Sequence, residues 1–147
     1  MLATNHALTG AVIGAYLPLP IAVPAAFASH FVLDAIPHYG IKHGKRNHSR
    51  TYKLIVFCDT FVALSIAFTA ALLHKWHMEI TGWVAWSPDL LWVIYYFAHG
   101  RDLHLKPKNW FMRFHMDIQW SETPKGILVE LVLLAILLPV YISQVLR

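Results

Sequence analysis

The chain has 147 residues, which is enough for one domain, and its formal net charge is +4. Apolar residues make up 57% of it and charged residues only 14%, whereas soluble domains carry about 25% charged residues. This deficit predicts an all-α integral membrane protein with a single transmembrane domain, 1–147. A lone cysteine, Cys58, excludes an intrachain disulfide and a multi-cysteine metal site, and no feature indicates nucleic-acid binding.

The first elements in the chain are two short helices between residues 5 and 36. Pro18 and Pro20 separate them, because proline removes a backbone donor and restricts the residue before it. Neither helix is long enough to cross a bilayer whose hydrocarbon core is about 30 Å thick. The pair is therefore a re-entrant hairpin or one broken, kinked span, and we prefer the hairpin.

Three transmembrane helices are expected to follow, at residues 52–73, 83–99 and 126–145. Ser87 and Pro88 look like the cap and first position of a helix, which makes Asp89 a structural residue. Residues 103–125 mix aromatic and basic side chains. This composition is typical of an interfacial segment lying on anionic lipid.

The basic residues fall on one side of this topology. With the hairpin, ten lysines and arginines lie beside the N-terminus and the connections 39–51 and 99–125, and only Lys75 and Arg147 lie opposite. The positive-inside rule then places the basic side in the cytoplasm. The expected location is the inner membrane of a bacterial-type cell, among membrane lipids, and a homo-oligomer is compatible with the pattern.

The segment 29–38 carries the strongest chemical signal. His30 and Asp34 share one helix face, and His38 follows four residues later. Imidazole and carboxylate groups are ligands for divalent metals, zinc first and manganese or iron next. The alternative is that His30 and Asp34 only hydrogen-bond to each other, but polar groups in a membrane are costly and usually functional.

The hairpin brings further polar residues to the same depth. Its two arms are of equal length, so His6 returns beside His30 and Asp34 and becomes a fourth candidate metal ligand. Asp59 lies within its span, while His99 and Asp102 stand where the third span meets the basic side. Because these three share the depth of the cluster, they are the candidate catalytic residues, as a base or as groups that orient the ligands.

The opening Thr-Asn-His-Ala-Leu-Thr-Gly and the later His-Phe-Val-Leu-Asp-Ala-Ile-Pro-His resemble bacterial membrane-bound metal-dependent hydrolases. Inner-membrane proteins described as LexA-binding hydrolases belong to that group. The resemblance covers about residues 4–40 and matches at His6, His30 and Asp34, which it implies are metal ligands. The family's His-Arg-Gly-x-Thr-His-Ser element has no counterpart here.

Together these features predict a membrane-embedded, metal-dependent hydrolase. Its substrate would be a lipid or an amphiphilic phosphate or acyl compound at the cytoplasmic leaflet. Buried histidine and aspartate also suit a small transporter or a proton-conducting or ion-conducting oligomer, and a non-catalytic membrane partner is the third alternative. Metal content separates the hydrolase from the non-catalytic partner, and flux through vesicles separates it from the transporter.

Overall fold

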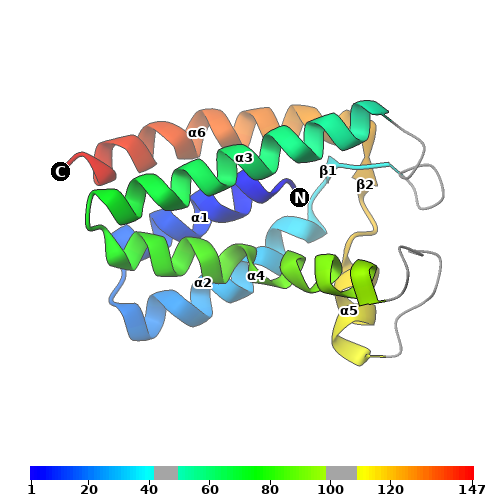
Figure 1. The fold of residues 1–147 in the computed structure, drawn as a ribbon, viewed down its shortest axis with the longest axis horizontal. Coiled ribbons are helices and arrows are strands. Elements are labelled where there is room, and N and C mark those ends of the chain that lie inside the picture. Colours follow the sequence, from blue (N-terminus) through cyan, green and yellow to red (C-terminus); the bar gives the residue numbers. More distant parts are fainter. Residues whose placement is uncertain (42–49, 99–108) are drawn as a thin grey trace.

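A computed structural model describes residues 1–41, 50–98 and 109–147. Within these residues the chain is almost entirely helical (Figure 1). The elements are α1 (Ala3–Tyr16), α2 (Leu19–Ala35), β1 (His38–Tyr39), α3 (Arg50–Leu72), α4 (Trp76–Ala98), α5 (Trp110–Ile118), β2 (Glu122–Thr123), the 3₁₀ turn η2 (Pro124–Gly126) and α6 (Ile127–Val145). The predicted all-α class is confirmed, with two very short strands that the sequence did not reveal.

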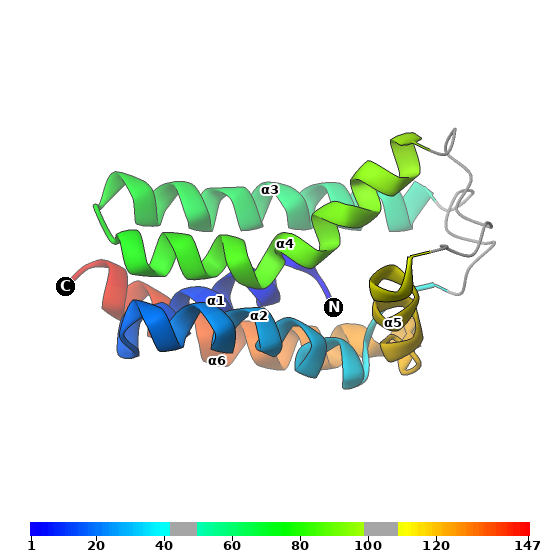
Figure 2. The same ribbon diagram turned by 90° about the horizontal axis from the view of Figure 1, so that it is seen from below.

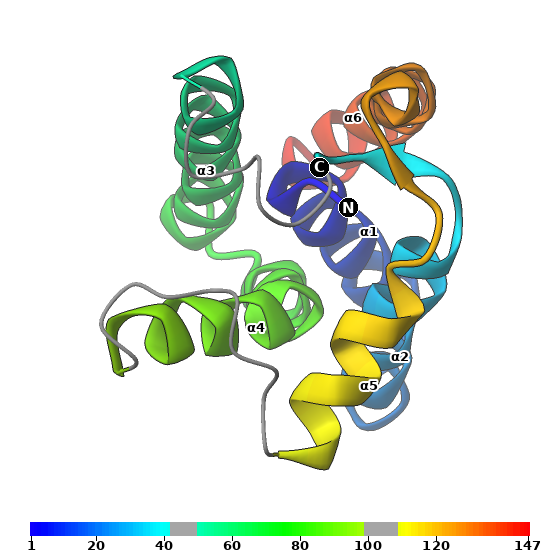
Figure 3. The ribbon, with the colours of Figure 1, turned by 90° about the vertical axis from the view of Figure 1, so that its right-hand side faces the viewer.

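Helix α1 lies at the centre of the bundle, as the end-on view in Figure 3 shows. It packs against α2, α3, α4 and α6. Its sequence suits this position because alanine, glycine and threonine occupy most of its positions, so that four neighbours can approach closely. The helix is consequently buried on nearly all sides, polar residues included.

Helices α1 and α2 form the predicted hairpin. The break falls at Leu17 and Pro18, which are extended, and α2 begins directly afterwards with Pro20 in its first turn. The chain then runs back along α1 (Figure 1), which excludes the single kinked span. A residue near the start of α1 therefore meets residues near the end of α2.

Among the residues that the structure describes, two helices are long and apolar enough to cross a membrane, Arg50–Leu72 and Pro124–Val145. Both leave large hydrophobic side chains exposed, including Phe57 (71%) on α3 and Leu128 (66%) on α6. Exposed apolar surface on this scale is unusual in a soluble monomer and marks a surface that contacts lipid or protein.

Helix α4 differs from the prediction at its start. It begins at Trp76 rather than residue 83, so Ser87 and Pro88 lie inside the helix and do not cap it. Pro88 lacks the N–H of an interior hydrogen bond and bends the helix there. Figure 2 shows that the second half of α4 runs in a different direction from the first.

Two small elements close one end of the bundle. Strands β1 and β2 pair in parallel, with His38 opposite Glu122. Helix α5 packs against α2 and α4, with His115 buried and Arg113 exposed. The predicted interfacial segment thus contains an amphipathic helix that lies across the end of the bundle where the N-terminus is found.

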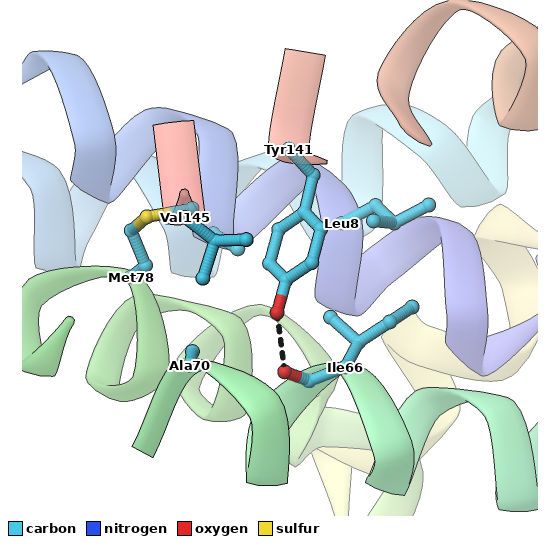
Figure 4. Close-up of a cluster of buried hydrophobic side chains, with 7 residues drawn as sticks. Leu8, Ile66, Ala70, Met78, Tyr141 and Val145 are labelled. Carbon is cyan, nitrogen blue, oxygen red and sulfur yellow. Dashed lines mark hydrogen bonds between the residues drawn. The ribbon is translucent and has the colours of Figure 1, made fainter. Parts of the chain in front are cut away.

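The other end of the bundle has an apolar core. Leu8, Ile66, Met78 and Val145 pack together there, and the Tyr141 hydroxyl donates a hydrogen bond to the Ile66 carbonyl at 2.6 Å (Figure 4). Apolar contacts of this kind hold α1, α3, α4 and α6 in one arrangement. They position the polar residues at the opposite end.

The close approach of α1 and α4 depends on Gly10. A Cβ at this position would collide with the Thr81 carbonyl and the Ala85 side chain. We expect Gly10→Ala to lower the free energy of unfolding by about 1–3 kcal/mol, because the helices must separate. Thermal unfolding in detergent measures this. Gly82→Ala is the control, since its new Cβ would lie 3.2 Å from the Ala7 carbonyl oxygen and needs only a small adjustment.

Candidate metal centre

Four side chains from three helices converge at the end of the bundle that carries α5. His30 and Asp34 come from α2, Asp89 from α4 and His115 from α5. Each offers one ligand atom, and these atoms lie within 4.8 Å of one another. Among the described residues, this is the group of side chains that could hold a metal ion.

Asp34 lies at the centre of this group and is fully buried. Its Oδ2 lies 3.0 Å from His115 Nε2, 3.3 Å from His30 Nε2 and 3.1 Å from the Gln119 amide nitrogen. Its Oδ1 accepts from His6 Nε2 at 3.2 Å and contacts the amino group of Met1. A carboxylate in this position is surrounded by donors on both oxygens, which keeps it ionised and fixed in orientation.

The tautomer of His30 is fixed by the hydrogen-bond partner of its Nδ1 atom. Its Nδ1 lies 2.8 Å from the Ala85 carbonyl oxygen, which can only accept, so Nδ1 carries the proton. Nε2 therefore presents a lone pair to the cluster. Metal-binding histidines commonly donate their other N–H to a carbonyl in this way.

His115 has the opposite arrangement. The Trp92 indole N–H, which can only donate, lies 3.1 Å from His115 Nδ1. A neutral His115 ring therefore carries its proton on Nε2 and directs it towards Asp34 Oδ2 and towards His30 Nε2, 2.9 Å away. As a result, His115 can bind a metal through Nε2 only after giving up this proton.

The distances between donors match the geometry of a small cation. With zinc bonds of about 2.0–2.1 Å, neighbouring ligands of a tetrahedron are roughly 3.3 Å apart. The separation between His30 Nε2 and Asp34 Oδ2 is 3.3 Å, and Asp89 Oδ1 lies 3.8 Å from His30 Nε2 and 3.6 Å from His115 Nε2. Small movements of the side chains would bring all of them within bonding distance of one ion.

Asp89 is the member of the group whose side chain is accessible from outside. Its side chain is 25% exposed, whereas those of His30 and Asp34 are fully buried. Asp89 also lines a cavity of about 670 Å³, between α3, α4, α5 and the start of α1. A ligand in that cavity could therefore approach the group from the side of Asp89.

Of the four predicted metal ligands, the structure brings three together. His6 stacks on His30 with ring centroids 4.0 Å apart, and its Nε2 contacts Asp34. His38 lies elsewhere, since its Nδ1 donates to the Ile36 carbonyl at 2.8 Å, and burial lowers the pKa of its imidazole. Pro37 ends α2 before His38, so the four-residue spacing does not continue along one helix face.

Of the three predicted catalytic residues, the structure describes only Asp59, and it is not a member of the group. Asp59 accepts hydrogen bonds from the backbone N–H groups of Ala3 at 2.7 Å and Thr4 at 3.0 Å, so it caps α1 from the neighbouring α3. Leu2, the residue before α1, provides no side-chain cap of its own. His99 and Asp102 lie outside the described residues.

Two members of the group, Asp89 and His115, were not predicted. Asp89 interrupts an apolar run, and an acidic residue at such a depth is itself a functional signal, but the Ser-Pro before it suggested a cap. His115 lies on the same helix face as Phe111 and Ile118, which are four and three positions away. A histidine on the apolar face of an amphipathic helix is the signal that could have revealed it.

Comparison with known protein families, curated proteins and solved structures found no match. The site is therefore interpreted from its own geometry.

Proposed function

We propose that this protein is a membrane-embedded, metal-dependent hydrolase. One observation carries the proposal: a buried His–Asp group has a single partly exposed member, Asp89, and that member lines a cavity. Structural metal sites are closed by protein ligands, whereas catalytic sites keep a position open for water or substrate. The arrangement of this group suits the second kind.

We assign His30, Asp34 and Asp89 as the ligands of a divalent ion, with zinc preferred over manganese or iron. One nitrogen and two carboxylate ligands suit each of these ions. A bound ion of this class lowers the pKa of a water molecule and polarises a phosphoryl or acyl oxygen. The predicted resemblance to membrane-bound metal-dependent hydrolases is based on the same His30 and Asp34, together with His6.

The remaining histidines support these ligands. His6 holds Asp34 through Oδ1, and His115 holds it through Oδ2, so the carboxylate is fixed from both sides. His115 is also the only one of the four grouped residues that carries a transferable proton on the atom facing its partners. We assign it the transfer of a proton to or from the reacting group.

The proposed location is a membrane, with the site near the cytoplasmic side. Among the described residues, two helices are long and apolar enough to span a bilayer, and the start of α3 and the end of α4, which adjoin the connections predicted to be cytoplasmic, lie at the end of the bundle where the site is found. The cavity combines apolar side chains, such as Val93 and Phe97, with polar ones, such as Lys53. This combination favours an amphiphilic substrate over a fully soluble one.

The transporter alternative is less well supported. An ion crossing the molecule would have to pass from the His–Asp group to the opposite end of the bundle. Leu8, Ile66, Met78 and Val145 fill the interior there (Figure 4). Such packing leaves few polar groups to replace the hydration of an ion.

The proposal is tested by metal content and hydrolysis together. The full chain, purified without chelators, should contain about one divalent ion per chain by mass spectrometry. It should release product from phospholipids or phosphorylated amphiphiles in micelles, and chelation followed by readdition of zinc or manganese should remove and restore this activity. Protein that binds no divalent ion from the medium would exclude the proposal.

A separate prediction concerns the proton of His115. In the metal-free protein, we expect the ring to be protonated on Nε2, because Trp92 donates to Nδ1. Nitrogen NMR of protein labelled at histidine measures the tautomer, with His115→Gln used to assign the signal. Trp92→Phe should remove the preference. Protonation of Nδ1 in the unsubstituted protein would contradict the assignment and make His115 a fourth ligand.

A further inference from the structure

The cavity beside Asp89 has two walls formed by regularly spaced residues. Helix α3 contributes Tyr52, Val56 and Thr60, and helix α4 contributes Leu90, Val93 and Phe97. In each helix these positions are three or four residues apart, so each wall is a single helix face. The cavity therefore runs lengthwise between α3 and the second half of α4.

These two helices separate towards this end of the molecule. They lie close together where α3 ends and α4 begins, and they are far apart at the other end, where α3 begins and α4 ends, as Figures 1 and 3 show. The bend at Pro88 directs the second half of α4 away from α3. This separation makes room for the cavity, and the cavity borders the outer surface of the bundle.

The outer edges of both walls are exposed and apolar. Val93 is 52% exposed and Phe97 is 65% exposed on α4, and Val56 is 37% exposed on α3. The neighbouring Phe57 and Ile94, which do not line the cavity, are also exposed, at 71% and 64%. An opening with apolar edges between two helices would let hydrocarbon chains reach the cavity from the side without crossing water.

The lining of the cavity also includes charged side chains. Lys53 is the one lysine or arginine among the described lining residues, and Asp89 is the link to the His–Asp group. The lining also includes the carboxylates of Asp59, which the start of α1 engages, and of Glu122. An anion between Lys53 and a metal held by Asp89 would face a positive charge at each end.

We infer that this cavity binds a phosphate-bearing lipid, which reaches it sideways from the bilayer between α3 and the second half of α4. The phosphate lies between Lys53 and the His–Asp group, and the acyl chains leave along Val93 and Phe97. The inference rests on the proposed function, because it assigns the second positive charge to a bound metal. A phosphate-bearing lipid is then the substrate class of the proposed metal site.

Photochemical labelling in lipid nanodiscs tests this inference. The probe is phosphatidic acid with a diazirine in one acyl chain, added to nanodiscs of phosphatidylcholine that hold the full chain. We expect labelled peptides to come from the walls at Tyr52–Thr60 and Leu90–Phe97. Labelling spread evenly over the exposed face of α6 would overturn the inference.

Two pairs of variants sharpen the test. Lys53→Gln should reduce labelling roughly ten-fold, because a charge-assisted contact is lost, while Lys125→Gln, an exposed lysine outside the cavity, should not. Val93→Trp should obstruct the opening and reduce labelling, while Ile94→Trp on the neighbouring position should not. Equal labelling in both members of each pair would overturn the inference.

Two further measurements distinguish failure of the lipid site from failure of the proposed metal-dependent function. Glycerol 3-phosphate should leave labelling unchanged at concentrations where unlabelled phosphatidic acid competes; equal competition would mean that the site binds free phosphate and would overturn lateral access. Metal content is measured on the same samples. Normal metal content without labelling of the walls refutes the lipid site alone, whereas absence of metal in all samples refutes the proposed function.

Discussion

Replacing His30 by alanine is expected to remove the bound metal. The Nε2 lone pair of this residue faces the group because Nδ1 donates to the Ala85 carbonyl. His115, the other histidine of the group, has its proton on Nε2 and so does not offer a lone pair there. Changes in groups that merely support a ligand cost about 10–100-fold in metal affinity, so loss of the ligand itself should cost more than roughly 100-fold. Metal content after gel filtration without added metal measures this.

The control for this prediction is a histidine far from the site. His77→Ala removes an exposed imidazole at the opposite end of α4 and should leave metal content unchanged. His30→Gln retains a polar side chain of similar reach and guards against simple unfolding, which circular dichroism monitors. Full metal content in both variants of His30 would remove this residue from the site and leave no nitrogen ligand in the correct tautomer.

Replacing Asp59 by alanine is expected to have the second large effect, which is on the stability of the fold and not on catalysis. Its carboxylate accepts from the N–H groups of Ala3 and Thr4, which are two of the donors that the first turn of α1 cannot pair internally. Asp59→Ala should lower the free energy of unfolding by about 3 kcal/mol, because two buried donors lose a charged acceptor. Chemical or thermal unfolding in detergent measures the loss.

Asp59→Asn distinguishes capping from catalysis. An amide retains one oxygen acceptor, so about half of the stability should return. Its folded fraction should bind metal and still turn over substrate, because Asp59 lines the cavity but does not belong to the His–Asp group. A stable Asp59→Asn protein with no activity would restore the role of base that the sequence suggested.

The sequence predicted the helical class and the hairpin because both depend on local chemistry. Pro18 breaks the helix whatever surrounds it, and equal arms then return His6 to Asp34. The start of α4 was predicted seven residues late, because Trp76 to Gly82 has too few apolar residues to resemble a span and is helical through contact with α1. Such tertiary contacts leave no periodic signal in the segment itself.

The site was predicted only where its members share one helix or one hairpin. His30 and Asp34 are four residues apart, and the hairpin adds His6. Asp89 and His115 join them through the packing of α4 and α5, which no spacing in the sequence encodes. His38 lies outside the group for a local reason, because Pro37 changes the direction of the chain immediately before it.

The two carboxylates that hold the start of α1 have a consequence for biosynthesis. Asp59 belongs to α3 and Glu130 to α6, and Glu130 accepts from the backbone N–H of Leu2 across 128 residues of chain. The ribosome therefore delivers the first helix long before its last partner. The first N–H groups of α1 therefore stay without these acceptors until α3 and then α6 have been made, so the start of α1 is held in place only when the final helix has packed.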